Sequence, residues 1–434
     1  MPRPSATGEP GARNRSALMK RVVVIGAGAA GTMAAIFAAS SGAETLLLER
    51  TKDGGRKILM SGGGRCNILP AVVHESRFVT DSSPHTLRKM LRSWPLGEQI
   101  AFFEDETGIP LMEETGSAKL FPQSESARDV RDRLLALARA RGVVIETGAL
   151  VAGFVPAGNG WQIERRGGPA LQADAVVVAT GGLSVPSTGS DGLGLRIVER
   201  LGHTINRTYP ALTPLTVTAQ RKPGTAGGAP FAALAGISLP VTLTARAGTL
   251  ESTSTGGFLF THNGYSGPAV LDVSHVAVRS RAGMDAPARL VVRWTSLNDQ
   301  DWESALGPRG ARTALNAVAA QLPRRLAEAL ITFAEIDLRR TLSQLTRDER
   351  LRLIDILVRC ELPWSGDEGY SKAEVTGGGV RLSEIDPRTM ESKIHKGLFL
   401  CGEMLDAFGP IGGYNFLWAW ATGRAAGRGA SRMQ

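Results

Sequence analysis

An apolar, β-branched run at residues 22–25 leads directly into the glycine pattern G-x-G-x-x-G at Gly26, Gly28 and Gly31. A helix of small residues is predicted to follow. Gly26 permits a tight turn, Gly28 lets the backbone approach a pyrophosphate, and Gly31 lets helix and strand pack closely. The pattern is typical of a βαβ unit that places a pyrophosphate at the N-terminus of a helix, where unpaired N–H groups and the macrodipole favour negative charge.

A second apolar strand is predicted over residues 45–48 and ends on the acid Glu49. An acid at this position accepts hydrogen bonds from both hydroxyls of an adenosine ribose and repels a 2′-phosphate. The strand, helix and acid together predict an α/β, Rossmann-like domain that binds an adenine dinucleotide. The alternative is a glycine-rich turn between strand and helix that holds no ligand.

Residues 22–39 are apolar enough to resemble a membrane span or a signal peptide. Their three glycines argue against a stable spanning helix, and the dinucleotide pattern explains the same residues better. Residues 1–20 have no apolar core, and we expect them to be a disordered N-terminal extension. We find no targeting signal and expect a cytoplasmic protein with no membrane partner.

The net charge is +9 and the isoelectric point is about 9.8. This balance favours an anionic partner such as nucleic acid, an acidic membrane or a phosphorylated substrate. The alternative is an arginine-rich composition that biases the whole surface. Three scattered cysteines, Cys66, Cys360 and Cys401, are too few for a disulfide framework or a zinc site, so we expect a reducing compartment and no metal.

A second glycine-rich loop, residues 55–67, reads GRKILMSGGGRCN and follows the ribose-binding acid. Successive N–H groups in such a loop can form a nest for an anion. Another apolar strand, residues 175–178, runs into Thr180 and Gly181, where the backbone is again expected to approach the cofactor.

The rest of the chain divides into segments with different patterns of apolar residues. Residues 84–141 are expected to be helical, including a helix capped by Ser126 that ends at Gly142. Period-two strands begin after residue 205, for example where Ile237, Leu239, Val241 and Leu243 alternate with smaller or polar residues. Residues 311–360 look helical, with a capping box from Thr346 to Glu349.

The last part of the chain repeats the pattern of the first, because a short apolar strand is predicted to end in Gly402 and Glu403. A helix from about Gly412 is expected to aim its N-terminal dipole at the N1/O2 edge of a flavin ring. NAD dehydrogenases seldom need such a terminal strand to complete the cofactor site, whereas the longer FAD does. The predicted domains are therefore an FAD-binding domain, residues 21–204 and 373–434, interrupted by an inserted substrate domain, residues 205–372.

Several motifs together resemble the bacterial BaiN/RdsA flavoproteins, which include aminoacetone oxidase-like members. The motifs are GRKILMSGGGRCN (55–67), FPQSESA (121–127), FLFTHNGYSGPAVLDVS (258–274), EVTGGGV (374–380) and GGYNFLWAWATG (412–423). The resemblance implies FAD in a two-dinucleotide-binding fold with an inserted β-barrel, residues 205–300, and a helical part, residues 301–372. The chain departs from the family pattern at Ile68-Leu69-Pro70 and at Ile411, where the family often carries hydroxyl or amide side chains.

The residues that we predict to hold FAD come from all of these loops. They are Gly26, Gly28, Ala29, Ala30, Gly31, Glu49, Arg50, Arg56, Lys57, Gly62, Gly63, Gly64, Asn67, Val151, Thr180, Gly181, Gly402, Glu403, Gly412, Gly413, Tyr414 and Asn415. Arg65 and Lys57 can neutralise the pyrophosphate or hold an anionic substrate, whereas Arg56 and Lys57 can equally lie in solvent. Glu403 suits the ribityl hydroxyls.

Two residues are candidates for proton transfer. The thiol of Cys66 can give a proton to one carbon of a double bond while the flavin supplies hydride to the other, although a free cysteine is usually a small buried hydrophobe. His262, in the inserted domain, can face the flavin from the substrate side or be structural. The sequence shows neither a Cys/His/Asp cluster for a metal nor a hydrolase nucleophile motif.

The resemblance implies three chemistries: reduction of a uridine in ribosomal RNA, oxidation of an amine, and reduction of an unsaturated steroid. We favour an FAD-dependent oxidoreductase that converts uridine in 23S ribosomal RNA to dihydrouridine. The alternatives are a small-molecule flavin oxidase or reductase and a non-catalytic flavin-bound RNA-binding module. The partner is thus ribosomal RNA or a small molecule, NAD(P)H is a possible transient reductant, and monomer and homodimer remain open.

Overall fold

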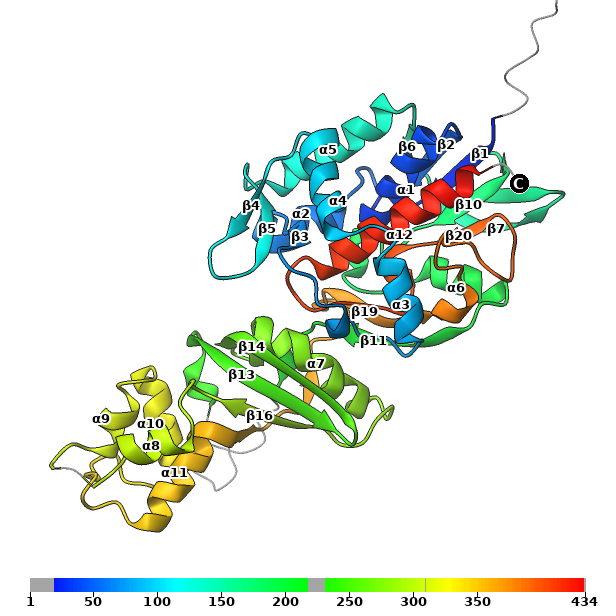
Figure 1. Ribbon diagram of the computed structural model, residues 1–434. Coiled ribbons are helices and arrows are strands. Elements are labelled where there is room, and N and C mark those ends of the chain that lie inside the picture. The colour runs from blue at the N-terminus through cyan, green and yellow to red at the C-terminus, as the bar shows by residue number, and fades with distance from the viewer. Residues whose placement is uncertain (1–18, 218–230, 309, 433–434) are drawn as a thin grey trace, which may run out of the picture.

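The computed structural model describes residues 19–217, 231–308 and 310–432, so most of the predicted N-terminal extension lies outside the described residues. The chain forms two parts, which meet where β11 (Ile205–Ala211), β19 (Val375–Val380) and α7 (Pro268–Arg281) lie close together (Figure 1). The segments before about residue 212 and after about residue 372 build the larger part, and the segment between them builds the smaller one.

A five-stranded parallel sheet lies at the centre of the larger part, in the order β20-β10-β1-β2-β6. All of its strands except the edge strand β6 are largely buried, apolar runs, as expected where helices cover both faces of a parallel sheet. The register pairs Val22 of β1 with Thr45 of β2 and with Ala175 of β10. The strand bounds are β1 (Arg21–Ile25), β2 (Glu44–Glu49), β6 (Val144–Thr147), β10 (Ala175–Val178) and β20 (Leu398–Leu400).

The C-terminal helix α12 (Tyr414–Ser431) packs along the first helix α1 (Ala29–Ser40), as Figure 1 shows. Glycines make this approach possible: a Cβ at Gly423 would lie 2.3 Å from the carbonyl oxygen of Ala30, and one at Gly427 would lie 2.2 Å from that of Ala34. The end of the chain therefore completes the dinucleotide-type unit at its beginning.

Residues 84–141 are only partly helical. The predicted Ser126 cap is confirmed, because its side chain accepts a hydrogen bond from the amide of Asp129 at the start of α5 (Ala127–Ala140). The helical expectation is wrong for residues 111–122, where β4 (Leu111–Glu114) and β5 (Lys119–Pro122) form an antiparallel hairpin. Polar residues between the two strands, with a turn at Gly116, hide this hairpin from a search for helical periodicity.

Other elements of the larger part connect and cover the central sheet. They are α2 (Arg56–Met60), β3 (Leu69–Pro70), which pairs with β5, α3 (Pro84–Leu91), α4 (Leu96–Ala101), a π-helical turn (Phe102–Glu106), β7 (Val151–Ala157), β8 (Gly160–Arg165), β9 (Leu171–Ala173) and α6 (Leu193–Arg200).

The smaller part contains a seven-stranded sheet in the order β17-β16-β13-β14-β15-β12-β18. Residues 238–247 of β13 alternate between exposed and buried positions, which confirms the predicted period-two strand. Helix α7 packs against β13 and β14. The bounds are β12 (Leu215–Thr216), β13 (Ser238–Ala247), β14 (Leu250–Phe260), β15 (Gly264–Ser266), β16 (Arg289–Arg293), β17 (Cys360–Leu362) and β18 (Gly366–Asp367).

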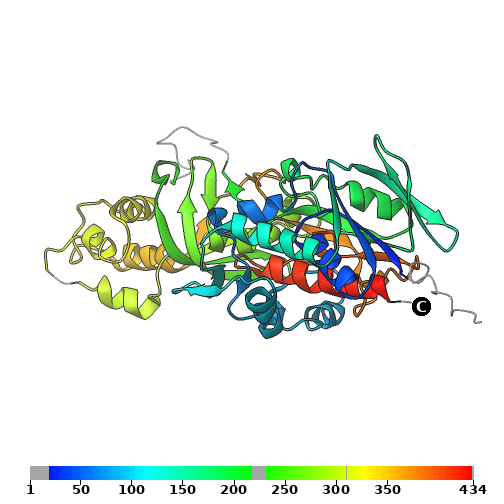
Figure 2. The ribbon, with the colours of Figure 1, turned by 90° about the horizontal axis from the view of Figure 1, so that it is seen from above.

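The end strands of this sheet, β17 and β18, are not paired with each other within the described residues, so the predicted β-barrel is not confirmed. Four helices lie beyond it, and the predicted capping box from Thr346 to Glu349 is present at the start of the last one. They are α8 (Asp299–Ala305), α9 (Ala314–Val318), α10 (Arg324–Phe333) and α11 (Arg347–Arg359). Figure 2 shows these helices at the far end of the molecule from the parallel sheet.

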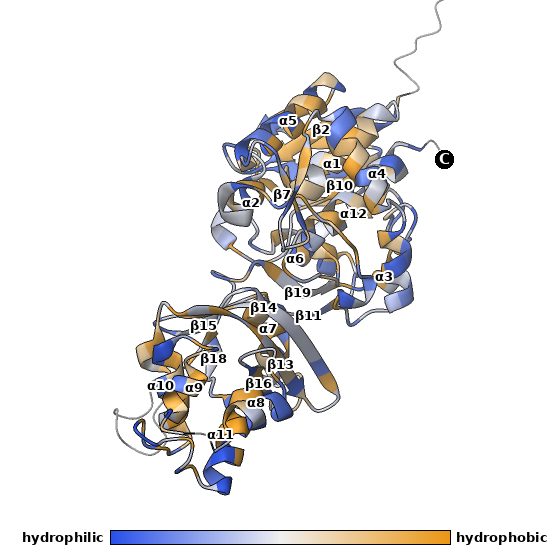
Figure 3. Cartoon of the chain, turned by 60° about the vertical axis from the view of Figure 1, so that its left-hand side comes forward, coloured by the Kyte–Doolittle hydropathy of each residue, from blue (hydrophilic) through white to orange (hydrophobic). Residues whose placement is uncertain are grey.

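Each part has its own apolar core, and Figure 3 shows hydrophobic residues inside both parts and hydrophilic ones on outer helices such as α3. A third, small cluster joins the two. It includes Tyr209, Leu212, Val278, Val375 and Phe408. The inserted part is thus packed against the loop that precedes α12.

Candidate functional site

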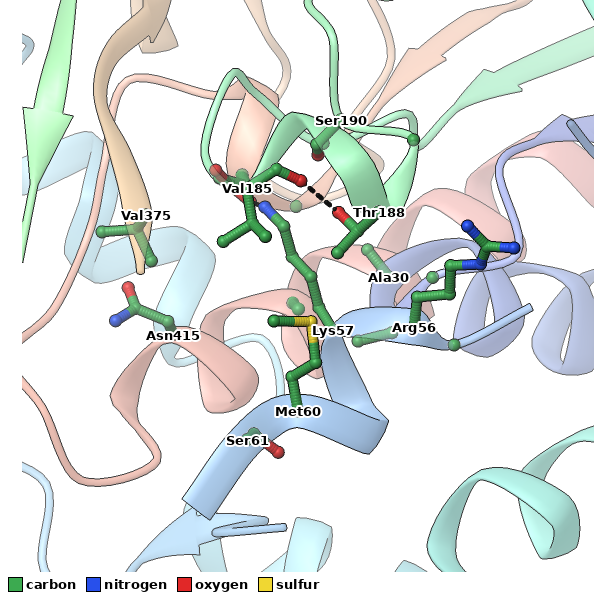
Figure 4. Close-up of a pocket in the computed structure, with 18 of the residues that line it drawn as sticks. Ala30, Arg56, Lys57, Met60, Ser61, Val185, Thr188, Ser190, Val375 and Asn415 are labelled. Carbon is green, nitrogen blue, oxygen red and sulfur yellow. Dashed lines mark hydrogen bonds and ion pairs between the residues drawn. The ribbon is translucent and has the colours of Figure 1, made fainter. Parts of the chain in front are cut away.

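A cavity of about 730 Å³ opens along the carboxyl ends of the parallel strands. Ligands of open α/β sheets bind at this edge. Figure 4 shows Lys57 and Arg56 of α2 near Val185 and Ser190 on one side, with Asn415 of α12 and Val375 of β19 on the other. The cavity therefore runs from the dinucleotide-type unit to the start of the C-terminal helix.

The three glycines of the first loop differ in the space around them. A Cβ at Gly26 would lie 2.6 Å from the carbonyl oxygen of Ala179, and one at Gly31 would lie 1.8 Å from that of Gly26. A Cβ at Gly28, by contrast, would have no atom within 4 Å. Gly26 and Gly31 thus serve close packing, whereas the space beside Gly28 is open for a ligand's phosphate groups.

The side chain of Glu49, at the end of β2, is fixed by hydrogen bonds that its carboxylate accepts. One oxygen accepts a hydrogen bond from the amide of Ala27 at 2.9 Å, and the other accepts from the amide and hydroxyl of Thr51 at 2.8 and 2.6 Å. The side chain still lines the cavity. These contacts orient the carboxylate beside the glycine loop, where a ribose would lie.

The side chains of the second glycine loop are paired with neighbouring loops. Lys57 donates to Glu403 at 2.5 Å and to the hydroxyl of Ser184 at 2.6 Å. Arg56 lies 3.0 Å from Asp53. The predicted neutralisation of a pyrophosphate by Lys57 is therefore indirect at best, since its ammonium group already has a carboxylate partner.

The start of α12 carries left-handed glycines, with φ of 115° at Gly412 and 86° at Gly413. In the orientation that satisfies its amide, Asn67 accepts a hydrogen bond from the amide of Gly413 at 3.1 Å and donates to the carbonyl of Leu69 at 3.0 Å. Asn415 closes the preceding loop through two hydrogen bonds to the backbone of Gly409. The second glycine loop and the C-terminal helix thus form one wall.

Most of the residues predicted to hold the cofactor line this cavity. They are Gly26, Gly28, Ala29, Ala30, Glu49, Arg50, Arg56, Lys57, Gly62, Gly63, Asn67, Val151, Thr180, Gly181, Gly402, Glu403, Gly412, Gly413 and Asn415.

Three of the predicted residues, Gly31, Gly64 and Tyr414, do not line the cavity. Gly31 packs against the backbone of Gly26. The ring of Tyr414 is buried, and its hydroxyl donates to the carbonyl of Val72 at 3.1 Å and accepts from the amide of His74 at 3.3 Å. Tyr414 therefore has a structural role, although its backbone opens the helix.

The two predicted catalytic side chains also lie off the cavity wall. Cys66 is fully buried, with a left-handed φ of 63°, and desolvation raises the pKa of its thiol to about 12. Its reversed backbone turns the thiol into the core. His262 is exposed in the turn between β14 and β15. The structure therefore places neither residue in the site. Their positions within or near specific motifs had suggested a place there.

Lys119 and Glu374 are among the charged residues on the wall that sequence reasoning did not assign to the site. Lys119 lies on β5, within the stretch expected to be helical. Glu374 is the acid of the quoted EVTGGGV motif, which could have indicated it. Glu374 is exposed where it faces the cavity, yet the surrounding protein desolvates its carboxyl group and raises its pKa. The charge of Asp272 raises this pKa further, whereas that of Lys119 lowers it.

The donor set suits an organic dinucleotide rather than a metal. Within the described residues, no group of three or more histidines, cysteines or acids is placed to hold a metal ion. None of the described helices has the length and apolarity of a membrane span. FAD fits the residues present, because the open space at Gly28, the acid Glu49 and the distant α12 start lie along one continuous cavity.

Comparisons with known proteins agree with this geometry. The family model described as HI0933-like protein Rossmann domain matches residues 20–429. The chain is 34% identical over 405 residues to a ribosomal RNA dihydrouridine synthase of Escherichia coli, covering 92% of this chain and 95% of that protein. It is 32% identical over 420 residues to a 3-dehydro-bile acid delta(4,6)-reductase of Clostridium scindens, covering 95% and 99%.

A second ribosomal RNA dihydrouridine synthase, from Haemophilus influenzae, is 32% identical to the chain over 425 residues, covering 95% of this chain and 98% of that protein. The similarity to all three relatives thus spans both parts of the structure. The chain belongs to the HI0933-like family of Rossmann-fold flavoproteins and is an FAD-dependent oxidoreductase.

Proposed function

We propose that the protein reduces the carbon–carbon double bond of a uracil ring in large-subunit ribosomal RNA and so forms dihydrouridine. The relatives from Escherichia coli and Haemophilus influenzae, similar over nearly their whole length, carry this activity in their names. The net charge of +9 favours an RNA partner, because cationic side chains that meet phosphates release counterions.

The observation that carries the proposal is the continuous cavity, which joins a dinucleotide cradle to a wall with free polar groups. Bound FAD supplies the hydride chemistry. Glu49 and the space at Gly28 hold its adenosine and phosphate end, and the residues from Gly412 to Asn415 frame the other end. The chain's remaining tasks are to orient the uracil, exclude bulk water and deliver a proton.

The inserted part, residues 205–372, is the proposed substrate-recognition domain. Its helix α7 is tied to the FAD-binding part through Asp272, which accepts a hydrogen bond from the amide of Ile411 at 2.8 Å and lies 3.2 Å from Arg77. The seven-stranded sheet and the helices beyond it make the molecule long.

A reduced nicotinamide that binds transiently is the proposed source of hydride. Ribosomal RNA as substrate implies action in the cytoplasm.

Reduction of a small unsaturated ketone is the second candidate, favoured by the relative from Clostridium scindens. The names of both kinds of relative describe saturation of a carbon–carbon double bond. In uracil this bond is conjugated with a carbonyl, as it is in a 3-oxo steroid with a Δ4 bond. One site can thus serve either substrate, and the inserted part would decide between them. A non-catalytic flavin-bound module would contain a flavin that no donor reduces.

Mass-spectrometric mapping of modified nucleosides tests the proposal. Ribosomal RNA is compared between cells with the gene, cells without it and cells in which it has been restored. We expect one or more dihydrouridines of the large-subunit RNA to disappear on deletion and to return on complementation. Unchanged dihydrouridine content after deletion would reject the RNA substrate and leave the small-molecule reductase.

A further inference from the structure

One acid on the cavity wall has no hydrogen-bond or ion-pair partner among the residues that the structure describes. Among the acids that line the cavity, Glu49 accepts three hydrogen bonds, Asp53 pairs with Arg56, Asp191 pairs with Arg50 and Glu403 pairs with Lys57. The fifth is Glu374, whose carboxyl group makes no hydrogen bond or ion pair within the described part of the chain. It is thus the cavity acid that remains available to a substrate.

The backbone of Glu374 is fixed on both sides. Its amide donates to the carbonyl of Leu212 at 3.2 Å, and its carbonyl accepts from the hydroxyl of Ser184 at 3.3 Å. It directly precedes β19, whose residues are all buried. The carboxyl group therefore projects from a rigid position, as a catalytic group requires.

The surroundings of Glu374 favour its neutral form. Desolvation raises its pKa, and the negative charge of Asp272 raises it further, whereas Lys119 lowers it. Asp272, on α7, is itself a buried acid that accepts from the amide of Ile411 and the hydroxyl of Ser254 at 2.8 and 2.9 Å. A carboxylic acid whose neutral form is favoured by its surroundings can act as a proton donor.

Lys119 is the neighbouring cation. Its side chain lies against the start of α12, since a Cβ at Gly412 would be 3.7 Å from its Cε. Of the lining cations, Arg50, Arg56, Lys57 and Arg65 are each paired with a carboxylate, whereas Lys119 and Lys372 have no ion pair within the described residues. Of these two, Lys119 is the one whose charge acts on Glu374. An ammonium group in this position can donate to a carbonyl oxygen that faces the cavity.

On the basis of the proposed function, we infer that Glu374 is the proton donor of the reduction and that Lys119 binds the carbonyl oxygen conjugated with the substrate's double bond. Bound FAD, once reduced, would supply a hydride to one carbon of that bond, and the other carbon takes the proton of Glu374. The π bond, the O–H bond of Glu374 and the N–H bond that held the hydride break, and two C–H bonds form. The carboxylate regains its proton from water.

The test uses full-length, flavin-loaded protein and the variants Glu374→Gln, Glu374→Asp and Lys119→Met. Glu113→Gln is the matched control, because Glu113 is an exposed acid on β4 that does not line the cavity. The reduced protein is mixed without oxygen with 2-cyclohexen-1-one, a simple enone, or with large-subunit ribosomal RNA from a strain lacking the gene. The return of oxidised-flavin absorbance gives the rate.

Glu374→Gln should slow the reaction by about 10²- to 10⁴-fold with both compounds, the range for loss of a general acid. Glu374→Asp should recover part of the rate. The wild-type rate should fall as pH rises through the pKa of Glu374, and that fall should vanish in Glu374→Gln. Lys119→Met should instead raise the enone concentration needed for half-maximal rate about tenfold.

Two readouts separate this role from a structural one. Glu374→Gln should keep the flavin spectrum and the affinity for the RNA, measured by filter binding. Difference infrared spectra should show a carboxylic acid band in wild type that persists to higher pH than for an ordinary glutamate and is absent in Glu374→Gln. Loss of the flavin, or an unchanged band in the variant, would contradict the inference.

The inference and the proposed function can fail separately. A Glu374→Gln rate within about threefold of wild type with both compounds would overturn the inference. Dependence on Glu374 with the enone, combined with RNA that even wild type fails to reduce, would keep the inference and reject uracil as substrate. Reaction of wild type with neither compound would overturn both.

Discussion

The Nζ atom of Lys57 lies 2.5 Å from Oε2 of Glu403, although the two residues are separated by most of the chain. Lys57 belongs to α2, after the first βαβ unit, and Glu403 follows β20 in the C-terminal return. The same carboxylate accepts hydrogen bonds from Ser184 and from the amide and hydroxyl of Thr376. This network joins four segments of the chain, and two of its members, Lys57 and Glu403, line the cavity.

Lys57→Met should weaken FAD binding. The substitution leaves the partly buried Glu403 carboxylate without its cation and frees α2 from the C-terminal segment. We expect the dissociation constant for FAD to rise about tenfold, equivalent to about 1.4 kcal/mol, in a fluorescence titration of the apoprotein. Lys52→Met is the control, since Lys52 is exposed and does not line the cavity. Equal affinity in the two variants would refute this role.

Gly28 and Gly31 should respond differently to alanine. Gly28→Ala has open space for the new methyl group and a permissive φ of −78°, so the protein should fold while its FAD affinity falls, because the methyl group occupies the phosphate space. Gly31→Ala would meet the Gly26 carbonyl oxygen and should lower the melting temperature. Thermal unfolding and flavin content of both variants provide the check. Normal flavin content in a folded Gly28→Ala protein would contradict the cradle.

Cys66→Ala should retain activity. The thiol is fully buried and does not line the cavity, and its pKa is raised to about 12 by desolvation. Turnover per bound flavin should stay within about threefold of wild type. A loss of about 100-fold with the flavin spectrum unchanged would instead restore Cys66 as the proton donor.

His275 should make folding stability depend on pH. Its ring is buried on α7 beside Phe408, and desolvation lowers its pKa to about 4 from 6.5. Between pH 6.5 and 4, the unfolded chain therefore binds a proton at His275 that the folded chain does not bind. The contribution of the neutral ring to the free energy of unfolding is present above pH 6.5 and is lost as pH falls toward 4. The loss should reach about 3 kcal/mol.

Urea unfolding of wild type and His275→Gln between these pH values measures that loss. The stability difference between the two proteins should shrink as pH falls, because only wild type carries the titrating ring. His85→Gln, at an exposed position on α3, should follow wild type throughout. Parallel curves for wild type and His275→Gln would show that His275 titrates normally.

The dinucleotide-type unit and most of the residues that line its cavity could be predicted because their signals are local. The glycines at Gly26 and Gly31 and the acid Glu49 reflect contacts within one βαβ unit, and the capping residues Ser126 and Thr346 act on their own helices. Each signal depends on spacing along the chain, which is visible in the sequence.

The substrate side could not be predicted in the same way, because distant segments meet there. Lys119 reaches the cavity from the short β4–β5 hairpin, and Glu374 reaches it from the position before β19. Only the fold places the two near the start of α12. Cys66 shows the reverse case. It stands in a specific motif, yet the left-handed backbone at that residue turns its thiol into the core.

The most direct test of the account is an anaerobic single turnover with purified, chemically reduced protein and large-subunit ribosomal RNA from a strain that lacks the gene. Flavin absorbance and dihydrouridine in the RNA are measured in the same sample. The account predicts that one dihydrouridine forms for each flavin oxidised, and that Glu374→Gln forms neither at a comparable rate. Oxidation of the flavin without dihydrouridine, or no oxidation by this RNA, would contradict it.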